Sequence, residues 1–263
     1  MLSEFKLYLR YIRIHLLSGL EYKGWPLMVL QMLIFTALDP LAVILIFSRF
    51  GNIGTWTMER ILLVYSITFT SFGLAESFCR GFDRFPWYMV RGGNFDRLLL
   101  RPKSLFTQVA ASYFHMHRVA RPLAGLVIIG WTLGRLDIAI SPQNIVILAF
   151  ALIGGFLMYT GVIVMNSGIS FFTIGGLDFM YIFTSASRDI ARIPVEHIPQ
   201  IMRKVFTFFV PMLVISYFPA SAVGGWDGAA WRGWLALPAG ALFLSFALVI
   251  WKIGVRHYKS VGS

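Results

Sequence analysis

Charged residues and cysteine are scarce in this sequence of 263 residues. Only 13% of the residues are Asp, Glu, Lys or Arg, whereas soluble domains usually carry about 25%. Cys79 is the single cysteine, which excludes an intrachain disulfide and a cysteine-based metal site. Hydrophobic residues make up 57% of the chain and are gathered into long runs. This composition is typical of an integral membrane protein.

The apolar runs predict six transmembrane helices, because a helix needs about 20 residues to cross a bilayer. Six such helices and their loops leave no room for a separate soluble catalytic domain. The sequence therefore predicts an all-α integral membrane protein, formed by residues 1–263 as one transmembrane domain. The predicted transmembrane helices are 26–47, 61–78, 113–133, 145–170, 205–223 and 235–251.

Residues 1–24 differ from these runs because charge interrupts them. Lys6, Arg10 and Arg13 lie off an apolar stripe with 3-4-3-4 spacing. The stripe consists of Leu2, Phe5, Leu9, Ile12 and Leu16. We therefore expect an amphipathic helix that lies in the headgroup layer before the first span. An ordinary soluble helix that packs on its own core is the alternative.

The basic residues give the expected orientation. If both ends of the chain are cytoplasmic, 19 of the 23 Lys and Arg residues fall in cytoplasmic segments, among them 188–204 between the fourth and fifth spans. The four on the other side are Arg49, Arg60, Arg135 and Arg232. Basic loops face the cytoplasm and anionic lipid. We read the net charge of +11 in this way, and not as a sign of nucleic-acid binding.

Asp39 is an ionisable residue midway along the first predicted span, directly before Pro40. An aspartate at the centre of a span costs about 2.5–3.5 kcal/mol, which the surrounding apolar residues offset. Two interpretations stay open. Asp39 could face a substrate path, or it could make a structural hydrogen bond where Pro40 kinks the helix.

Three further charged residues are candidates for the same path. Glu76 precedes Arg80 by four residues, a spacing that favours a structural pair on one helix. Arg118 and Arg121 lie in the inner half of the third predicted span. Because arginine is costly in lipid, we expect them at the interface or in an inward-facing cavity. The candidate path residues are thus Asp39, Glu76, Arg118 and Arg121.

Gly130 and Gly134 stand four residues apart in the third predicted span. Small residues at this spacing can form a close-packing face between membrane helices. Such pairs also arise by chance in glycine-rich spans.

The segment 90–102 between the second and third predicted spans reads VRGGNFDRLLLRP. Its two glycines allow a sharp turn, Asn94 is a favourable N-cap, and Asp96 suits the first helical turn. Pro102 limits continuation of the helix. We expect a short cytoplasmic helix with an exposed surface of charged and apolar residues, suited to docking a cytosolic partner. A plain connecting loop is the alternative.

These residues resemble the ABC-2 family of permease proteins. The pattern of that family in this segment is matched by Val90, Arg91, Gly93, Asp96, Leu99, Arg101 and Pro102. Further matches, in order along the chain, are 192–195, 209–211, 217–220 and 254–260.

The resemblance implies a bacterial ABC exporter subunit in the cytoplasmic (inner) membrane. It implies a coupling helix between the second and third spans that contacts the ATPase through Arg91, Gly93, Asp96, Arg97, Leu99, Arg101 and Pro102. It also implies two ATP-binding cassette subunits and a second permease, more often a different related chain than an identical one. The sequence holds no Gly-Lys dipeptide, hence no Walker A loop, so ATP and Mg²⁺ would be bound by the partner subunits.

Two other classes are weaker interpretations. An ion-coupled secondary transporter, with Asp39 as its intramembrane ionisable group, would be expected to show internal repeats and acidic residues in several spans. A membrane-embedded enzyme would need a compact set of histidine and acidic residues at one depth. The sequence shows neither pattern, and we predict no catalytic and no metal-binding residues.

Overall fold

The structure, a computed structural model, describes residues 2–114, 116–173 and 178–259. Within these ranges every regular element is a helix, apart from one isolated bridge between Ile53 and Trp56. The helices are α1 Leu2–Glu21, α2 Trp25–Phe50, α3 Met58–Phe78, α4 Arg80–Phe85, α5 Phe95–Leu99, α6 Leu105–Ala111, α7 Ala120–Arg135, α8 Pro142–Thr173, α9 Asp178–Ile190, α10 Gln200–Lys204, α11 Met212–Ile215, α12 Tyr217–Gly224 and α13 Ala236–His257.

Four helices of the described chain are long and apolar enough to cross a membrane. They are Trp25–Phe50, Met58–Phe78, Pro142–Thr173 and Ala230–His257. These helices contain the first, second, fourth and sixth predicted spans. Long apolar runs with few charges form helices in lipid because a helix satisfies their backbone groups internally. A multi-pass, all-helical membrane protein is therefore confirmed.

The third predicted span, 113–133, starts later than expected. Residues 113 and 114 lie outside any helix, a 3-10 turn covers Met116–Val119, and α7 has only 16 residues. Pro122 stands in the first turn of α7, where its missing N–H costs no helical hydrogen bond. The regular α-helix therefore begins at Ala120, within the predicted span.

The fifth predicted span, 205–223, is not a straight helix. Gln200–Phe209 and Met212–Gly224 meet at a bend of 71°. The bend falls at Val210, which is extended with φ −117° and ψ 95°, directly before Pro211. Proline disfavours the helical conformation in the residue before it and cannot donate to the preceding turn. Hydropathy alone does not distinguish such a bent pair from a span.

Ring contacts and hydrogen bonds define the two ends of the bundle. At one end, Phe172 of α8 lies against His257 of α13, with ring centroids 5.3 Å apart. At the other end, Trp56 of the α2–α3 loop donates to Glu196 across 2.6 Å and lies 5.7 Å from the Trp226 ring. The chain therefore passes from the first end to the second between Thr173 and Glu196, along α9. The bent pair, which begins after Glu196 and ends before Trp226, enters and leaves at the second end.

This path corrects the expected position of 188–204, which we placed on the same side as both termini. Arg203 donates to the Glu196 backbone carbonyl across 3.5 Å, so it lies at the Trp56 end. Arg192, Arg203 and Lys204 thus move to the side of the α2–α3 loop, while Arg188 lies within α9. Of the 23 Lys and Arg residues, 15 instead of 19 then lie on the side of the two chain termini, which still holds the majority.

Replacing Trp56 with phenylalanine is expected to loosen the second end. Trp56 is 5% exposed, and its indole N–H donates to a carboxylate. Because a hydrogen bond to a charged group contributes about 1.5–3 kcal/mol, the melting temperature in detergent should fall by several degrees. Trp131→Phe, at an exposed position on α7, is the control and should change little. Equal melting temperatures for the two variants would show that the hydrogen bond from Trp56 to Glu196 does not stabilise this end.

The helices α8 and α13 form a parallel pair with glycine at the contact. Gly154 on α8 faces Gly240 on α13, and Gly168 faces Gly254 fourteen residues further on. A Cβ atom at any of these four positions would overlap or crowd backbone atoms of the other helix. Glycine at these positions therefore lets the two backbones approach closely, as in other membrane helix pairs.

The two glycines predicted from the sequence as a close-packing pair, Gly130 and Gly134, do not form such a contact. A Cβ atom at Gly130 or Gly134 would meet nothing within 4 Å, so these two glycines pack against no described part of this chain. The close contact between α8 and α13 comes instead from Gly154 and Gly168 on α8 and from Gly240 and Gly254 on α13, fourteen residues apart on each helix.

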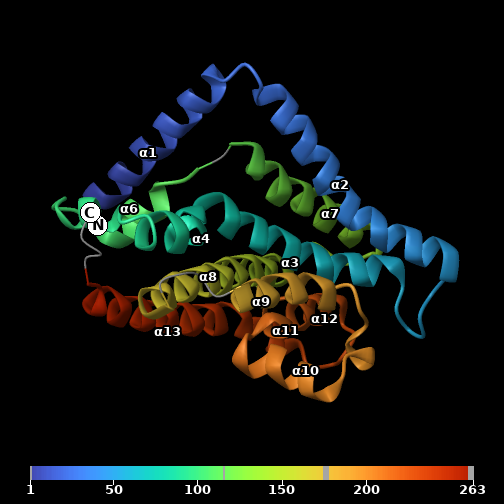
Figure 1. The fold of residues 1–263 in the computed structure, drawn as a ribbon. Helices are drawn as coiled ribbons and strands as arrows, with labels where there is room; N and C mark the ends of the chain where they lie inside the picture. The colour runs from blue at the N-terminus through green and yellow to red at the C-terminus, as the bar shows by residue number, and fades with distance from the viewer. Residues whose placement is uncertain (1, 115, 174–177, 260–263) are drawn as a thin grey trace.

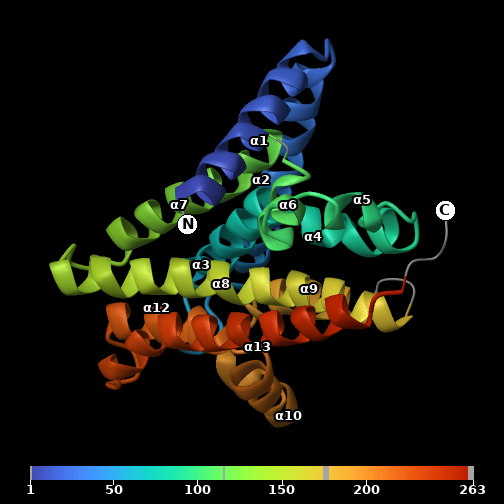
Figure 2. The same ribbon diagram turned by 90° about the vertical axis from the view of Figure 1, so that its left-hand side faces the viewer.

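The first two helices form an inverted V over the remaining helices (Figure 1). Near the start of α1, the Tyr8 hydroxyl donates to the Phe78 carbonyl at the end of α3 across 2.7 Å. Most of α2 is exposed, with only Thr36, Val43 and Phe47 buried. Figure 2 shows α1 and α2 standing away from the layer formed by α8 and α13. The predicted amphipathic helix at 1–24 is present as α1, with Phe5 and Leu9 exposed.

Candidate functional site

An open cavity lies beneath α2, where this helix stands away from the bundle. It contains about 1330 Å³ of empty space, open to the surroundings. Three of the four predicted path residues, Asp39, Arg118 and Arg121, line it together. The remaining lining residues all come from α2: Met28, Gln31, Met32, Phe35 and Leu38.

The fourth candidate, Glu76, lies directly behind the two cavity arginines. Its two carboxylate oxygens accept hydrogen bonds from Arg118 and Arg121, which come from the start of α7 and the turn before it. Arg80, one helical turn further along the chain, donates to the same carboxylate across 2.6 Å. The Glu76 side chain is only 12% exposed. One mostly buried carboxylate therefore holds three guanidinium groups.

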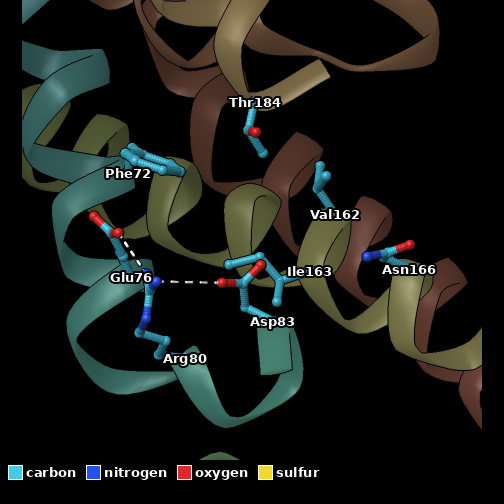
Figure 3. A pocket seen from close by; sticks show the side chains of 8 residues that line it. All are labelled: Phe72, Glu76, Arg80, Asp83, Val162, Ile163, Asn166 and Thr184. Atoms are coloured by element: carbon cyan, nitrogen blue, oxygen red, sulfur yellow. Dashed lines mark hydrogen bonds and ion pairs between the residues drawn. The ribbon is translucent and has the colours of Figure 1, made fainter. Parts of the chain in front are cut away.

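Arg80 also faces a second acidic residue, Asp83, at 3.6 Å. Figure 3 shows Glu76, Arg80 and Asp83 in a small pocket, with Phe72 on α3 and Val162, Ile163 and Asn166 on α8. The ion pair between Glu76 and Arg80 that the sequence predicts is confirmed. The structure adds that the same glutamate connects α3 to the segment that carries Arg118 and Arg121.

One face of α3 carries aromatic rings that stack under arginines of other elements. Phe69 and Phe72 lie 5.7 and 5.5 Å from the Arg121 guanidinium. Arg188 of α9 lies 4.8 Å from Phe72, and Arg192 lies 5.1 Å from Tyr65. Cations over aromatic faces gain about 0.5–2 kcal/mol each, more when desolvated. The aromatic face of α3 thus helps to hold three arginines inside a membrane protein.

Arg188 and Arg192 were missed as site residues. Their distance from Glu76 in the sequence and their expected place in a cytoplasmic loop gave no reason to connect them with the cavity. The available signal was the spacing of Tyr65, Phe69 and Phe72, which puts three rings on one face of a helix. That signal becomes specific only when the partner helix is known.

Asp39 forms an ion pair with Arg192, 2.8 Å away and 153 residues later in the chain. The pair connects α2 to the end of α9, with side chains 30% and 23% exposed. Of the two interpretations from the sequence, the pair provides a structural partner for Asp39, and the cavity also places Asp39 along a candidate path. It is not a lone charge in the membrane.

The segment predicted as a coupling helix lies at the end of the molecule that holds the C-terminal ends of α8 and α13. A short helix is present as α5, and Gly93 precedes it with φ +66°. The Asn94 side chain does not cap the helix but donates backwards to the Tyr88 carbonyl across 3.0 Å. Leu98 is 7% exposed, whereas Leu100 is 85% exposed.

The other residues predicted for this segment divide into exposed and anchored ones. Arg97, Leu99 and Pro102 are exposed. Arg91 is also exposed and stacks on Trp87 at 5.2 Å, and Arg101 donates to the Tyr11 hydroxyl of α1 across 3.1 Å. Asp96 faces Tyr258, where burial and the carboxylate together raise the pKa of the Tyr258 phenol. The segment therefore presents an outer surface while its inner face is fixed to the protein.

An aromatic cluster provides that fixation. Phe95 of α5 lies 5.2 Å from Phe171 of α8 and 4.8 Å from Tyr258, which directly follows α13. Phe85 lies 4.9 Å from Trp251 of α13. Edge-to-face ring pairs of this kind contribute about 0.5–1.5 kcal/mol each beyond their buried area. Through this cluster, α5 is in direct contact with the C-terminal end of α8 and with the residue that follows α13.

The described part of the chain contains no group of three or more His, Cys, Asp and Glu side chains placed to hold a metal ion. Polar chemistry in the cavity is instead dominated by arginine.

The fold and the cavity define a class of protein: a multi-pass helical membrane protein with a charged, partly open interior. The sequence matches the family described as ABC-2 family transporter protein over residues 33–262. The chain therefore belongs to the ABC-2 transporter family and is a membrane permease component of an ABC transporter. No curated protein and no solved structure matches it.

Proposed function

We propose that this chain is the transmembrane permease of an ATP-driven exporter and that α5 is its docking element for a separate ATP-binding subunit. The observation that carries this proposal is the position of α5 in this chain. The helix projects Arg97, Leu99 and Leu100 outward. Its Phe95 anchors it to α8 and to Tyr258, which follows α13. A knob with an exposed apolar tip and a rigid base suits transmission of force.

In this mechanism, ATP and Mg²⁺ are bound by two cassette subunits, and closure of those subunits moves α5. The aromatic cluster passes the movement to the parallel α8–α13 pair. A second permease, more often a different related chain, completes the assembly. The cavity beneath α2, with Asp39, Glu76, Arg118 and Arg121 along it, is the proposed substrate path, and alternating access opens it to one side and then the other.

We propose six membrane crossings with α9 as the fifth, in place of 205–223. The end that holds α1, α5 and the C-terminal part of α13 is the cytoplasmic end, because it keeps most of the basic residues. The bent pair Gln200–Phe209 and Met212–Gly224 then dips into the membrane from the outer side. The location is the cytoplasmic membrane of a bacterium.

The ion-coupled alternative loses its basis. It depended on Asp39 as a free ionisable group, and Asp39 is paired with Arg192. Family membership likewise favours an ABC transporter.

Affinity purification of the tagged chain in a mild detergent tests the proposal. The expected result is co-purification of a protein with a Walker A loop, with or without a second permease. Repeated purification of the intact chain alone would contradict it and would return ion-driven transport to consideration.

Replacing Leu100 with glutamate is expected to weaken docking by about tenfold, because a carboxylate that loses water in an apolar contact without a partner costs about 1–3 kcal/mol. The purified complex should contain less ATPase, and ATP hydrolysis should fall in proportion, while the melting temperature of the permease stays unchanged. Ile140→Glu is the control, since Ile140 is 78% exposed in the loop between α7 and α8. Equal loss of ATPase in both variants would argue against α5 as the docking element.

A further inference from the structure

The cavity beneath α2 has one wall that is mostly apolar and one wall that is cationic. Met28, Met32, Phe35 and Leu38 of α2 form the apolar wall, and Arg118 and Arg121 lie opposite them. Methionine side chains adapt to apolar groups of irregular shape. Such a surface accepts a molecule with an apolar part and a polar part at one end.

The charges around the cavity leave a positive excess on Arg118 and Arg121. These two guanidinium groups share one carboxylate, that of Glu76, which also binds Arg80. The other acidic residue of the cavity, Asp39, is already neutralised by Arg192. A cationic ligand would therefore meet repulsion at this wall, whereas an anion would balance the excess.

The hydrogen-bonding groups point to the same conclusion. Each guanidinium offers five N–H donors and no acceptor. The Nε–H groups of Arg118 and Arg121 are buried and have no hydrogen-bond partner in the part of the chain that the structure describes, so donors outnumber acceptors around these two side chains. Donors in excess fit a ligand that only accepts, such as a phosphate, sulfate or carboxylate group.

The apolar wall continues beyond the arginines. A second hollow, with about 740 Å³ of empty space, shares Met28 with the first and is lined by Trp25, Val29 and Phe114. From Trp25 to Asp39 the α2 helix rises about 21 Å at 1.5 Å per residue. This length accommodates an extended hydrocarbon chain along α2.

We propose that the cavity binds an anionic amphiphile, with its acidic headgroup on Arg118 and Arg121 and its apolar chain along α2 from Asp39 towards Trp25. This assignment deepens the proposed function, because it rests on the cavity being the substrate path. A membrane lipid with an acidic headgroup and a transported amphiphile share this chemistry.

Thermal unfolding of the purified full chain in dodecyl maltoside tests the site without any ATPase. Dodecyl phosphate, added at a small mole fraction of the detergent, should raise the melting temperature in a saturable way. Dodecyltrimethylammonium and inorganic phosphate at the same concentration should not, because one carries the wrong charge and the other lacks the chain. A shift with the cation as large as that with the anion would overturn the charge assignment, and an equal shift with inorganic phosphate would overturn the amphiphile.

Gln31→Glu locates the effect. Gln31 is exposed on the cavity wall, so a carboxylate at this position should leave folding intact and weaken binding of dodecyl phosphate by about tenfold. The matched control is Gln143→Glu, exposed at the start of α8 and outside the cavity, which should bind like the unmodified chain. Equal binding by both variants would place the anion elsewhere and overturn the proposal.

Measurement of ATPase activity distinguishes a transported amphiphile from a bound membrane lipid. It also distinguishes failure of the proposed permease function from failure of the proposed binding site. If an ATPase co-purifies, stimulation of its activity by dodecyl phosphate supports a transported amphiphile, whereas a melting shift with phosphatidylglycerol and no stimulation supports a bound lipid. Absence of an ATPase would count against the permease assignment only, because the melting shift does not depend on it.

Discussion

Substitution of Glu76 by glutamine is expected to destabilise this protein more than any other single change of a charged residue. The carboxylate is 12% exposed and accepts hydrogen bonds from Arg80, Arg118 and Arg121. An amide of the same size leaves Arg118 and Arg121 without their counter-charge and close to Arg80, which keeps only Asp83 at 3.6 Å. Removal of one partner from a buried ion pair costs about 3–5 kcal/mol. Most molecules of the Glu76→Gln variant should therefore be unfolded at moderate temperature.

The measurement is thermal unfolding in detergent, with yield of monodisperse protein as a second readout. Glu21→Gln, at the exposed end of α1, is the control and should behave as the unmodified chain. Replacing Arg118 and Arg121 with glutamine in the Glu76→Gln background should restore much of the stability, because Arg80 still has Asp83 within 3.6 Å. A Glu76→Gln variant as stable as the control would show that the arginines do not depend on this carboxylate.

Substitution of Gly240 by alanine is expected to separate α8 from α13. The added methyl group would overlap the backbone carbonyl of Gly154, and alanine has no alternative rotamer that avoids it. The helices must therefore move apart, at a cost of about 1–3 kcal/mol. The melting temperature should fall, and Gly154→Ala should have a similar effect through the Ala236 carbonyl.

The chain provides a control of opposite sign. Gly130 on α7 has nothing within 4 Å of an added Cβ atom. Because alanine favours helix over glycine by about 0.5–1 kcal/mol, Gly130→Ala should be neutral or slightly stabilising. If Gly130→Ala and Gly240→Ala lowered the melting temperature equally, the effect would come from glycine loss in general and not from the α8–α13 contact.

The sequence predicted the class of protein because hydropathy follows directly from the solvent. Long apolar runs at 26–47, 61–78, 145–170 and 235–251 can satisfy their backbone groups in lipid only as helices. The family pattern around Arg91 to Pro102 was equally local, and the short helix at α5 is present. Such features depend on neighbouring residues alone.

The candidate site was predictable in part. Asp39, Arg118 and Arg121 were singled out because charges are costly in a span, and they line one cavity. Their partners were not predictable, since Arg192 lies 153 residues from Asp39, and Glu76 lies 42 and 45 residues from Arg118 and Arg121. The pairing energy of buried charges depends on three-dimensional proximity, which a single sequence does not contain.

The sequence by itself determined that this chain is an all-helical membrane protein of the ABC-2 type with a turn and short helix at 90–102. The tertiary structure decided that 205–223 bends at Val210 and returns to the end where it started. It also decided which glycines matter, Gly154 and Gly240 instead of Gly130 and Gly134. The physical reason is the same in each case: transfer into lipid is a property of one segment, whereas bends, close contacts and ion pairs depend on what the segment packs against.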